Sequence, residues 1–170
     1  MINIRTASNL SAYTLDVLIR RGYTFRHMAR LPVERADEFC GLVAQFIRKS
    51  RDHDETVSTT LDKISVLLQS FPKSSCFWVI EKQDKLIGYF FAEAMLDDKG
   101  KMTCIVHQTF VSSRARHGNL MVEIEDILAS WCRSIGVLTM RFLTSRRAWP
   151  FIKKLRGDWE IESVVVTRCV

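Results

Sequence analysis

Apolar and polar positions divide this chain into runs typical of strands and spaced stripes typical of helices. Three apolar runs, rich in β-branched and aromatic residues, follow one another in the middle of the chain. A short polar turn at Gln83-Asp84 joins the first two runs. This pattern predicts a meander of strands over residues 76–82, 85–95 and 102–111.

Helical stripes flank the meander on both sides. Apolar residues three and four positions apart predict one helix from residue 33 or 34 to about 49 and a second over 56–70. After the meander, a helix over 120–135 is predicted to end at Gly136. A sparser stripe near the start predicts a short helix within an N-terminal extension, residues 1–22.

Shorter segments complete the predicted order of elements. Residues 23–31 alternate as a strand does and stop before Pro32, and 137–143 form a short apolar run. A last helix is predicted over 146–155 and a last strand over 159–170. The order β-α-α-β-β-β-α-β-α-β predicts one α/β (α+β) domain over residues 1–170, a mixed, mostly antiparallel sheet flanked by helices.

The amino-acid composition indicates the cellular compartment of the protein and argues against several kinds of functional site. The 170 residues are 47% hydrophobic, which suffices for one buried core. Five cysteines without a C-x-x-C pair or a Cys/His cluster indicate buried thiols in a reducing, cytoplasmic setting and no metal site. No signal pattern and no long apolar run occurs, so we expect no membrane partner. The sequence also has no phosphate loop and no Ser-His-Asp order.

The charge balance favours anionic partners in general. The formal net charge is +6, which attracts nucleic acid, a phosphorylated cofactor or an acidic protein surface without choosing among them. An anionic or protein partner is the expectation, with nucleic acid among the alternatives. The oligomeric state cannot be read from the sequence.

Basic residues concentrate between the meander and the helix that follows it. Residues 112–119, called the basic loop below, read Ser-Ser-Arg-Ala-Arg-His-Gly-Asn. A helix begins immediately afterwards. Unpaired backbone N–H groups and the helix dipole both favour an anion at a helix N-terminus. The basic loop is therefore a candidate anion site, with a solvated surface loop as the alternative.

The element order and this loop resemble the GCN5-related N-acetyltransferase (GNAT) family. The family pattern at the loop is Arg or Gln, two residues, Gly, one residue, and Gly or Ala, and it falls on residues 116–121, where Arg116 matches. A later family segment, Ala-Ile-x-Leu-Tyr-Glu-Lys-Leu-Gly-Phe, is similar to this chain with one residue inserted before the glycine. The matching residues there are Ala148, Phe151, Lys154, Leu155, Gly157 and Trp159.

The resemblance implies that acetyl-CoA binds at the basic loop. Asn119 and Met121 replace the two family glycines, and the Met121 side chain is expected to obstruct a pyrophosphate. Replacing Met121 by glycine is therefore expected to raise coenzyme A affinity. The residues that the resemblance assigns to cofactor binding are Val111, Arg114, Arg116, His117, Gly118, Asn119 and Met121.

Two residues of the meander are candidate catalytic bases. Glu93 follows Gly88 on the second strand, where the resemblance implies a carboxylate that deprotonates the amine; the alternative is a salt bridge. His107 on the third strand is the other candidate, against a core histidine. Family members have an asparagine, and a tyrosine that acts as the general acid for the leaving thiolate, where this chain has Ser145 and Ile152.

Two functions remain open on these grounds. Loss of the second glycine and of the tyrosine favours a non-catalytic binding or structural protein that uses a basic surface on an acetyltransferase-like fold. The alternative is an acyl-CoA-dependent N-acyltransferase, in which an amine attacks the thioester directly. In that case Tyr89 could replace the missing acid only if the sheet splays it toward the leaving thiolate.

Overall fold

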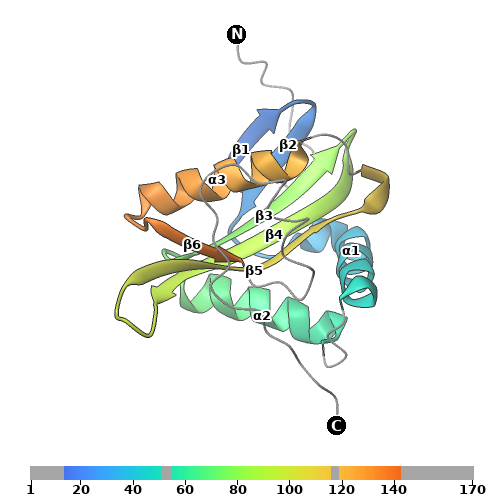
Figure 1. The fold of residues 1–170 in the computed structure, drawn as a ribbon. Coiled ribbons are helices and arrows are strands. Elements are labelled where there is room, and N and C mark those ends of the chain that lie inside the picture. The colour runs from blue at the N-terminus through green and yellow to red at the C-terminus, as the bar shows by residue number, and fades with distance from the viewer. Residues whose placement is uncertain (1–13, 51–54, 116–118, 143–170) are drawn as a thin grey trace.

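The computed structural model describes residues 14–50, 55–115 and 119–142, which build a six-stranded sheet with helices on both faces (Figure 1). The strands lie side by side in chain order from β1 to β6. All neighbouring strands are antiparallel except β5 and β6, which are parallel. The elements are β1 (Thr14–Arg20), β2 (Tyr23–Met28), η2 (Val33–Arg35), α1 (Ala36–Lys49), α2 (Val57–Ser70), β3 (Ser75–Lys82), β4 (Lys85–Leu96), β5 (Met102–Val111), η3 (Ser113–Ala115), α3 (Leu120–Ser134) and β6 (Thr139–Phe142).

The predicted mixed, mostly antiparallel sheet is confirmed, and so is the meander at its centre. The helix predicted over 56–70 begins one residue later because Thr56 is its cap: the Thr56 hydroxyl accepts a hydrogen bond from the Thr59 N–H at 3.2 Å. Gly136, at φ of 75°, follows α3 as predicted. The predicted helix over 146–155 and the strand over 159–170 lie outside the described residues.

The prediction of an N-terminal helix is wrong for the part of the chain that the structure describes. Residues 14–20 form β1, which pairs with β2 along its whole length. The turn between them, Arg21-Gly22, has φ of 50° and 80°, the left-handed conformation that two-residue hairpins require. Hairpin pairing has overridden the weak helical spacing, so these residues extend the sheet rather than precede it.

The sheet separates two apolar clusters, one on each face. One face packs against α3, and its cluster contains Phe25, Trp78 and Phe90 together with Leu120 and Ile124 of that helix. We call it the α3 face. The opposite face packs against α1 and α2 (Figure 1) and is called the α1/α2 face. Its buried residues are Met28, Phe39, Leu42, Val43, Ile64, Leu68, Phe77, Val79, Leu86, Tyr89, Phe91 and Phe110.

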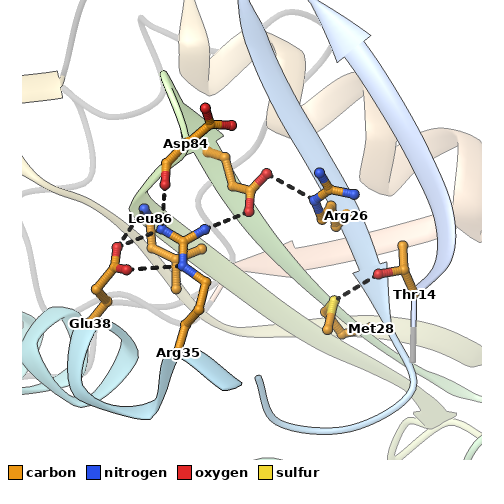
Figure 2. A network of polar contacts seen from close by, with 8 residues as sticks. Thr14, Arg26, Met28, Arg35, Glu38, Asp84 and Leu86 are labelled. Atoms are coloured by element: carbon orange, nitrogen blue, oxygen red, sulfur yellow. Dashed lines mark hydrogen bonds and ion pairs between the residues drawn. The ribbon is translucent and has the colours of Figure 1, made fainter. Parts of the chain in front are cut away.

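A buried ionic network fastens the start of α1 to the sheet (Figure 2). Glu81 of β3 is only 2% exposed, and its two carboxylate oxygens accept from Arg26 at 2.8 Å and Arg35 at 2.7 Å. Arg35 also donates to both oxygens of Glu38, at 3.0 and 2.6 Å, and to the Asp84 carbonyl at 2.7 Å. A buried carboxylate needs such partners to stay charged. This network therefore joins β2, β3 and α1 to the β3–β4 turn.

Two expectations drawn from composition can be compared with the described residues. Cys76, Cys104 and Cys132 are buried free thiols, and Cys40 is a half-buried one. Cys169 lies outside the described residues. Among the helices that the structure describes, none has both the length and the apolar character of a membrane span.

Candidate functional site

The end of β5 and the start of α3 bring the described part of the predicted cofactor site together. Val111, the last residue of β5, is 4% exposed and pairs with Gly88 of β4. Arg114 lies in η3, Asn119 is the N-cap of α3, and Met121 lies in the first turn of that helix. Arg116, His117 and Gly118 lie outside the described residues.

The two replacements of family glycines are accommodated by ordinary structure. Asn119 has φ of −92°, so its backbone conformation is open to any residue and needs no glycine. Met121 is half-buried and packs against the cluster of the α3 face. That packing counts against the expected obstruction, because a side chain held against the core occupies less of the space before the helix.

Backbone donors gather at the N-terminus of α3. The N–H groups of Val122 and Glu123 donate to the Asn119 carbonyl at 2.9 and 3.1 Å. The N–H groups of Leu120 and Met121 precede these first bonds, in the part of a helix whose donors lack intrahelical acceptors. The geometry therefore suits an anion, provided that nearby charge does not oppose it.

One acidic side chain stands at this helix terminus, and two arginines compensate it. Glu123 is 7% exposed and lies in the first turn of α3. Its oxygens lie 3.4 Å from Arg20 and 2.9 Å from Arg21, which end β1 and begin the β1–β2 turn. The three groups carry a net positive charge, so the helix terminus stays favourable to an anion. Sequence reasoning missed this contact because it placed the arginines outside the sheet.

The two candidate bases are neighbours on the α1/α2 face. Nε2 of His107 lies 3.2 Å from Oε1 of Glu93, and the His107 ring stacks on Phe91 with centroids 5.5 Å apart. Nε2 itself is buried and has no aligned hydrogen-bond partner, so the contact is close without being a formed hydrogen bond. The side chains are 28% and 18% exposed. Both side chains are therefore partly accessible to solvent.

A β-bulge explains why His107 faces this side. Phe91 pairs with Gln108 and Ala92 pairs with Val106, which leaves His107 as an extra residue in β5. Without the bulge, consecutive side chains would point to opposite faces. Instead His107 contacts Phe91 and Gln108 contacts Tyr89, and both of these β4 residues belong to the cluster of the α1/α2 face.

Tyr89 does not occupy the position of an acid for a leaving thiolate. Its side chain is fully buried on the α1/α2 face, and its hydroxyl donates to Oε1 of Gln108 at 2.9 Å. Burial, and then the charge of Glu55, raise the pKa of Tyr89 well above its ordinary value. The hydroxyl is thus engaged in a hydrogen bond and releases its proton less readily than an exposed tyrosine does. These surroundings oppose a role for Tyr89 as the replacement acid for the leaving thiolate.

The described residues contain no group of three or more His, Cys, Asp or Glu side chains placed to hold a metal ion. Such a group would need several of these side chains converging at ligand distances.

Comparison with known proteins finds similar solved structures but no similar sequence. Neither a protein-family model nor a curated protein sequence matches the chain. Among solved structures it is similar to glucosamine-6-phosphate N-acetyltransferase from Arabidopsis thaliana, at 17% identity and a TM-score of 0.61, over 85% of this chain and 97% of that one. It is also similar to ribosomal-protein-alanine N-acetyltransferase from Brucella melitensis biovar Abortus 2308, at 14% identity and a TM-score of 0.63, over 87% and 100%.

A third similar structure contains acetyl-CoA. It is a predicted acetyltransferase with acetyl-CoA from Clostridium acetobutylicum, at 11% identity and a TM-score of 0.64, over 86% of this chain and 96% of that one. At such identities the likeness shows the fold alone. The chain thus resembles the GCN5-related N-acetyltransferase family in fold, as its element order predicts.

Proposed function

We propose that this protein is an acyl-CoA-dependent N-acyltransferase that transfers an acetyl group to an amine. The observation that carries the proposal is the contact between Glu93 and His107, partly exposed and 3.2 Å apart on an acetyltransferase-type sheet. A carboxylate that contacts an imidazole is an arrangement suited to accepting a proton from an attacking amine.

In this proposal His107 accepts the proton and Glu93 holds the ring. With its proton on Nε2, facing Glu93, the imidazole keeps a lone pair on Nδ1 that can accept the proton of the amine. The Glu93 carboxylate then stabilises the imidazolium that forms. The C–N bond forms as the C–S bond breaks, and the thiolate takes its proton from solvent, because Tyr89 donates to Gln108 instead.

The described residues that we propose to hold the acyl-CoA phosphates lie at the N-terminus of α3. Leu120 and Met121 supply backbone donors at the N-terminus of α3, and Arg20 with Arg21 balance the charge of Glu123 there. Bound acyl-CoA would supply the activated acyl group as a thioester. Asn119 needs no glycine conformation, and Met121 packs against the core.

The competing proposal is the non-catalytic protein that the motif departures favour. It would bind an anionic or protein partner through the basic loop and use no base. The contact between Glu93 and His107 supports the enzyme, because it places a partly exposed proton acceptor beside a carboxylate. In both proposals Arg116→Ala is expected to weaken anion binding and reduce its salt dependence.

Thiol release from acetyl-CoA in the presence of a panel of primary amines tests the enzyme proposal. We expect turnover by the unmodified protein and a fall in kcat of about 100-fold or more for Glu93→Gln and for His107→Gln. Because a base acts on the chemical step, KM for acetyl-CoA should change by less than about twofold. Glu34→Gln, which removes an exposed carboxylate of η2, is the matched control and should keep full activity.

Two results would decide against this function. Binding of acetyl-CoA without turnover over the whole panel would favour the non-catalytic protein. Turnover that survives both Glu93→Gln and His107→Gln would assign the reaction to other residues.

A further inference from the structure

A chain of buried hydrogen bonds runs beside the candidate base and has no part in the proton transfer described above. Tyr89 donates to Oε1 of Gln108 at 2.9 Å. Nε2 of Gln108 donates to Oε1 of Glu55 at 2.7 Å, and Lys63 donates to the same oxygen at 3.2 Å. Gln108 immediately follows His107 in β5. The chain therefore links β4, β5 and the start of α2 at the residue next to the candidate base.

The chemistry of each group gives this chain one direction. An ionised Glu55 has no proton to donate, so it must accept from the Gln108 amide N–H. The Gln108 carbonyl oxygen is then left to accept, which makes the Tyr89 hydroxyl the donor. Tyr89 is fully buried, Gln108 is 7% exposed and the Glu55 side chain is 7% exposed. Reversing any one of these bonds would bury an unsatisfied group, which costs about 1–3 kcal/mol.

The bulge makes this fixed direction matter for His107. The extra residue of a bulge leaves the regular ladder, so its orientation depends on what holds its neighbours. Gln108 is the neighbour on one side, and it is bonded to Tyr89 on β4 and to Glu55 in the segment just before α2. Phe91 and Glu93 contact the His107 ring, but both lie on β4. The Gln108 contacts, called the Gln108 clamp, join the bulge to the segment that leads into α2.

We propose that Gln108 is a positioning residue for the acyl transfer, holding His107 in its orientation toward Glu93 through hydrogen bonds to Tyr89 and Glu55. The inference rests on the proposed function for its catalytic meaning. Its structural content, one orientation of the His107 ring, can be measured in the protein alone.

A double variant that exchanges the amide and the carboxylate distinguishes a positioning role of Gln108 from a general effect on stability. Gln108→Leu removes both hydrogen bonds, and Gln108→Glu places two carboxylates together. The double variant Glu55→Gln with Gln108→Glu restores an amide facing a carboxylate, and Tyr89 still donates to residue 108. Glu38→Gln is the stability control, because it removes contacts of α1 with Arg35 and Leu86 far along the chain from β5.

Two readouts are compared across these variants. The first is the pair of ring ¹⁵N chemical shifts of His107, assigned by their loss in His107→Gln, which report the nitrogen that carries the proton. The second is kcat with acetyl-CoA and an accepted amine. We expect separate, single-tautomer shifts in the unmodified protein and merged shifts in both single variants. We expect kcat about tenfold or more lower in those variants, with recovery of both readouts in the double variant.

Unchanged ring shifts in Gln108→Leu would overturn the positioning role, and so would losses that Glu38→Gln reproduces or that the double variant fails to repair. Merged shifts in the Gln108 variants, together with no turnover by the unmodified protein, would overturn the proposed function. They would still support the clamp on His107. The two failures are therefore distinguishable.

Discussion

Gly88 lies where the backbones of β4 and β5 come too close together for a side chain. A Cβ placed on it would meet the Phe110 carbonyl oxygen at 2.5 Å and the Cα of Val111 at 3.2 Å. Its backbone φ is not the reason for glycine here, because the constraint is the space on the facing strand. Since Val111 leads directly into the basic loop, this close approach helps to place the loop.

Gly88→Ala is accordingly expected to destabilise the protein by about 1–3 kcal/mol, the usual cost of overpacking. The contact is with backbone, which cannot move as a flexible side chain can. Urea unfolding followed by tryptophan fluorescence measures the change. Gly41→Ala on α1 is the control, because a Cβ there meets nothing within 4 Å, and it should be neutral or stabilising. Equal stability of the two variants would contradict the close approach.

Met121 calls for a revised expectation about cofactor affinity. The sequence alone suggests that Met121→Gly helps a pyrophosphate approach, but the side chain packs against the core of the α3 face. Removing it loses that packing and adds a helix-propensity cost of about 1 kcal/mol. We therefore expect calorimetry to show coenzyme A affinity unchanged or weaker in Met121→Gly, and a lower unfolding temperature. A clear gain in affinity would restore the obstruction argument.

The elements that sequence patterns predict well are those whose partners are close in the chain. The runs of β3, β4 and β5 and the stripes of α1, α2 and α3 carry their own periodicity, and their bounds follow from it. The hairpin of β1 and β2 was missed, although a two-residue Arg21-Gly22 turn between apolar runs is a hairpin signal. The apolar positions before Arg21 also fit a helix, and only pairing with β2 decides between the two.

In the candidate site, too, the contacts that depend on strand pairing could not be predicted from the sequence. Glu93 and His107 were each chosen by residue type and strand, which the structure respects. Their contact could not be predicted, because it depends on the β4–β5 register and on a bulge that places His107 and Gln108 on one face. A bulge has no reliable sequence signal beyond glycine in one of its forms. The Gln108 contacts with Tyr89 and Glu55 were missed for the same reason.

Glu81 is the residue on which the attachment of α1 to the sheet depends. We expect Glu81→Gln to lower the free energy of unfolding by about 3–5 kcal/mol, because it leaves the charges of Arg26 and Arg35 without their buried counter-charge. Denaturant unfolding measures the loss. Glu34→Gln removes an exposed partner of Arg30 at 3.7 Å and should cost less than about 1 kcal/mol. A loss in Glu81→Gln no larger than in Glu34→Gln would show that the buried network contributes little.

The two faces of the sheet divide the proposed work of the whole molecule. On the α3 face, the N-terminus of α3 is the site that we propose for the phosphates of the cofactor. The α1/α2 face holds Glu93, His107 and the Gln108 clamp, where an amine would meet its base. β5 contributes to both sites. Its last residue, Val111, leads into the basic loop, and His107 and Gln108 lie on the α1/α2 face.

Acid should lower the stability of this protein in two steps, because the pKa values of His27 and Glu38 are lowered in the folded state. Burial lowers the pKa of His27 from its ordinary 6.5, although Asp16 opposes the shift. A hydrogen bond from Arg35 lowers the pKa of Glu38 from its ordinary 4.5. In both cases the unfolded chain binds a proton more readily than the folded one. Stability is therefore complete above each ordinary value and is lost as the pH falls below it.

We predict that the urea midpoint declines from about pH 6.5 downward and declines again below about pH 4.5, where protonation of Glu38 weakens its contacts with Arg35 and the Leu86 N–H. Glu38→Gln should start from a lower midpoint at pH 7 and show a shallower second decline, while its first decline is unchanged. Asp37→Asn, one residue earlier in α1, is the control and should keep both declines. A midpoint that rises between pH 6.5 and 4 would mean that His27 is charged in the folded protein, stabilised there by Asp16 despite its stacking on Trp78.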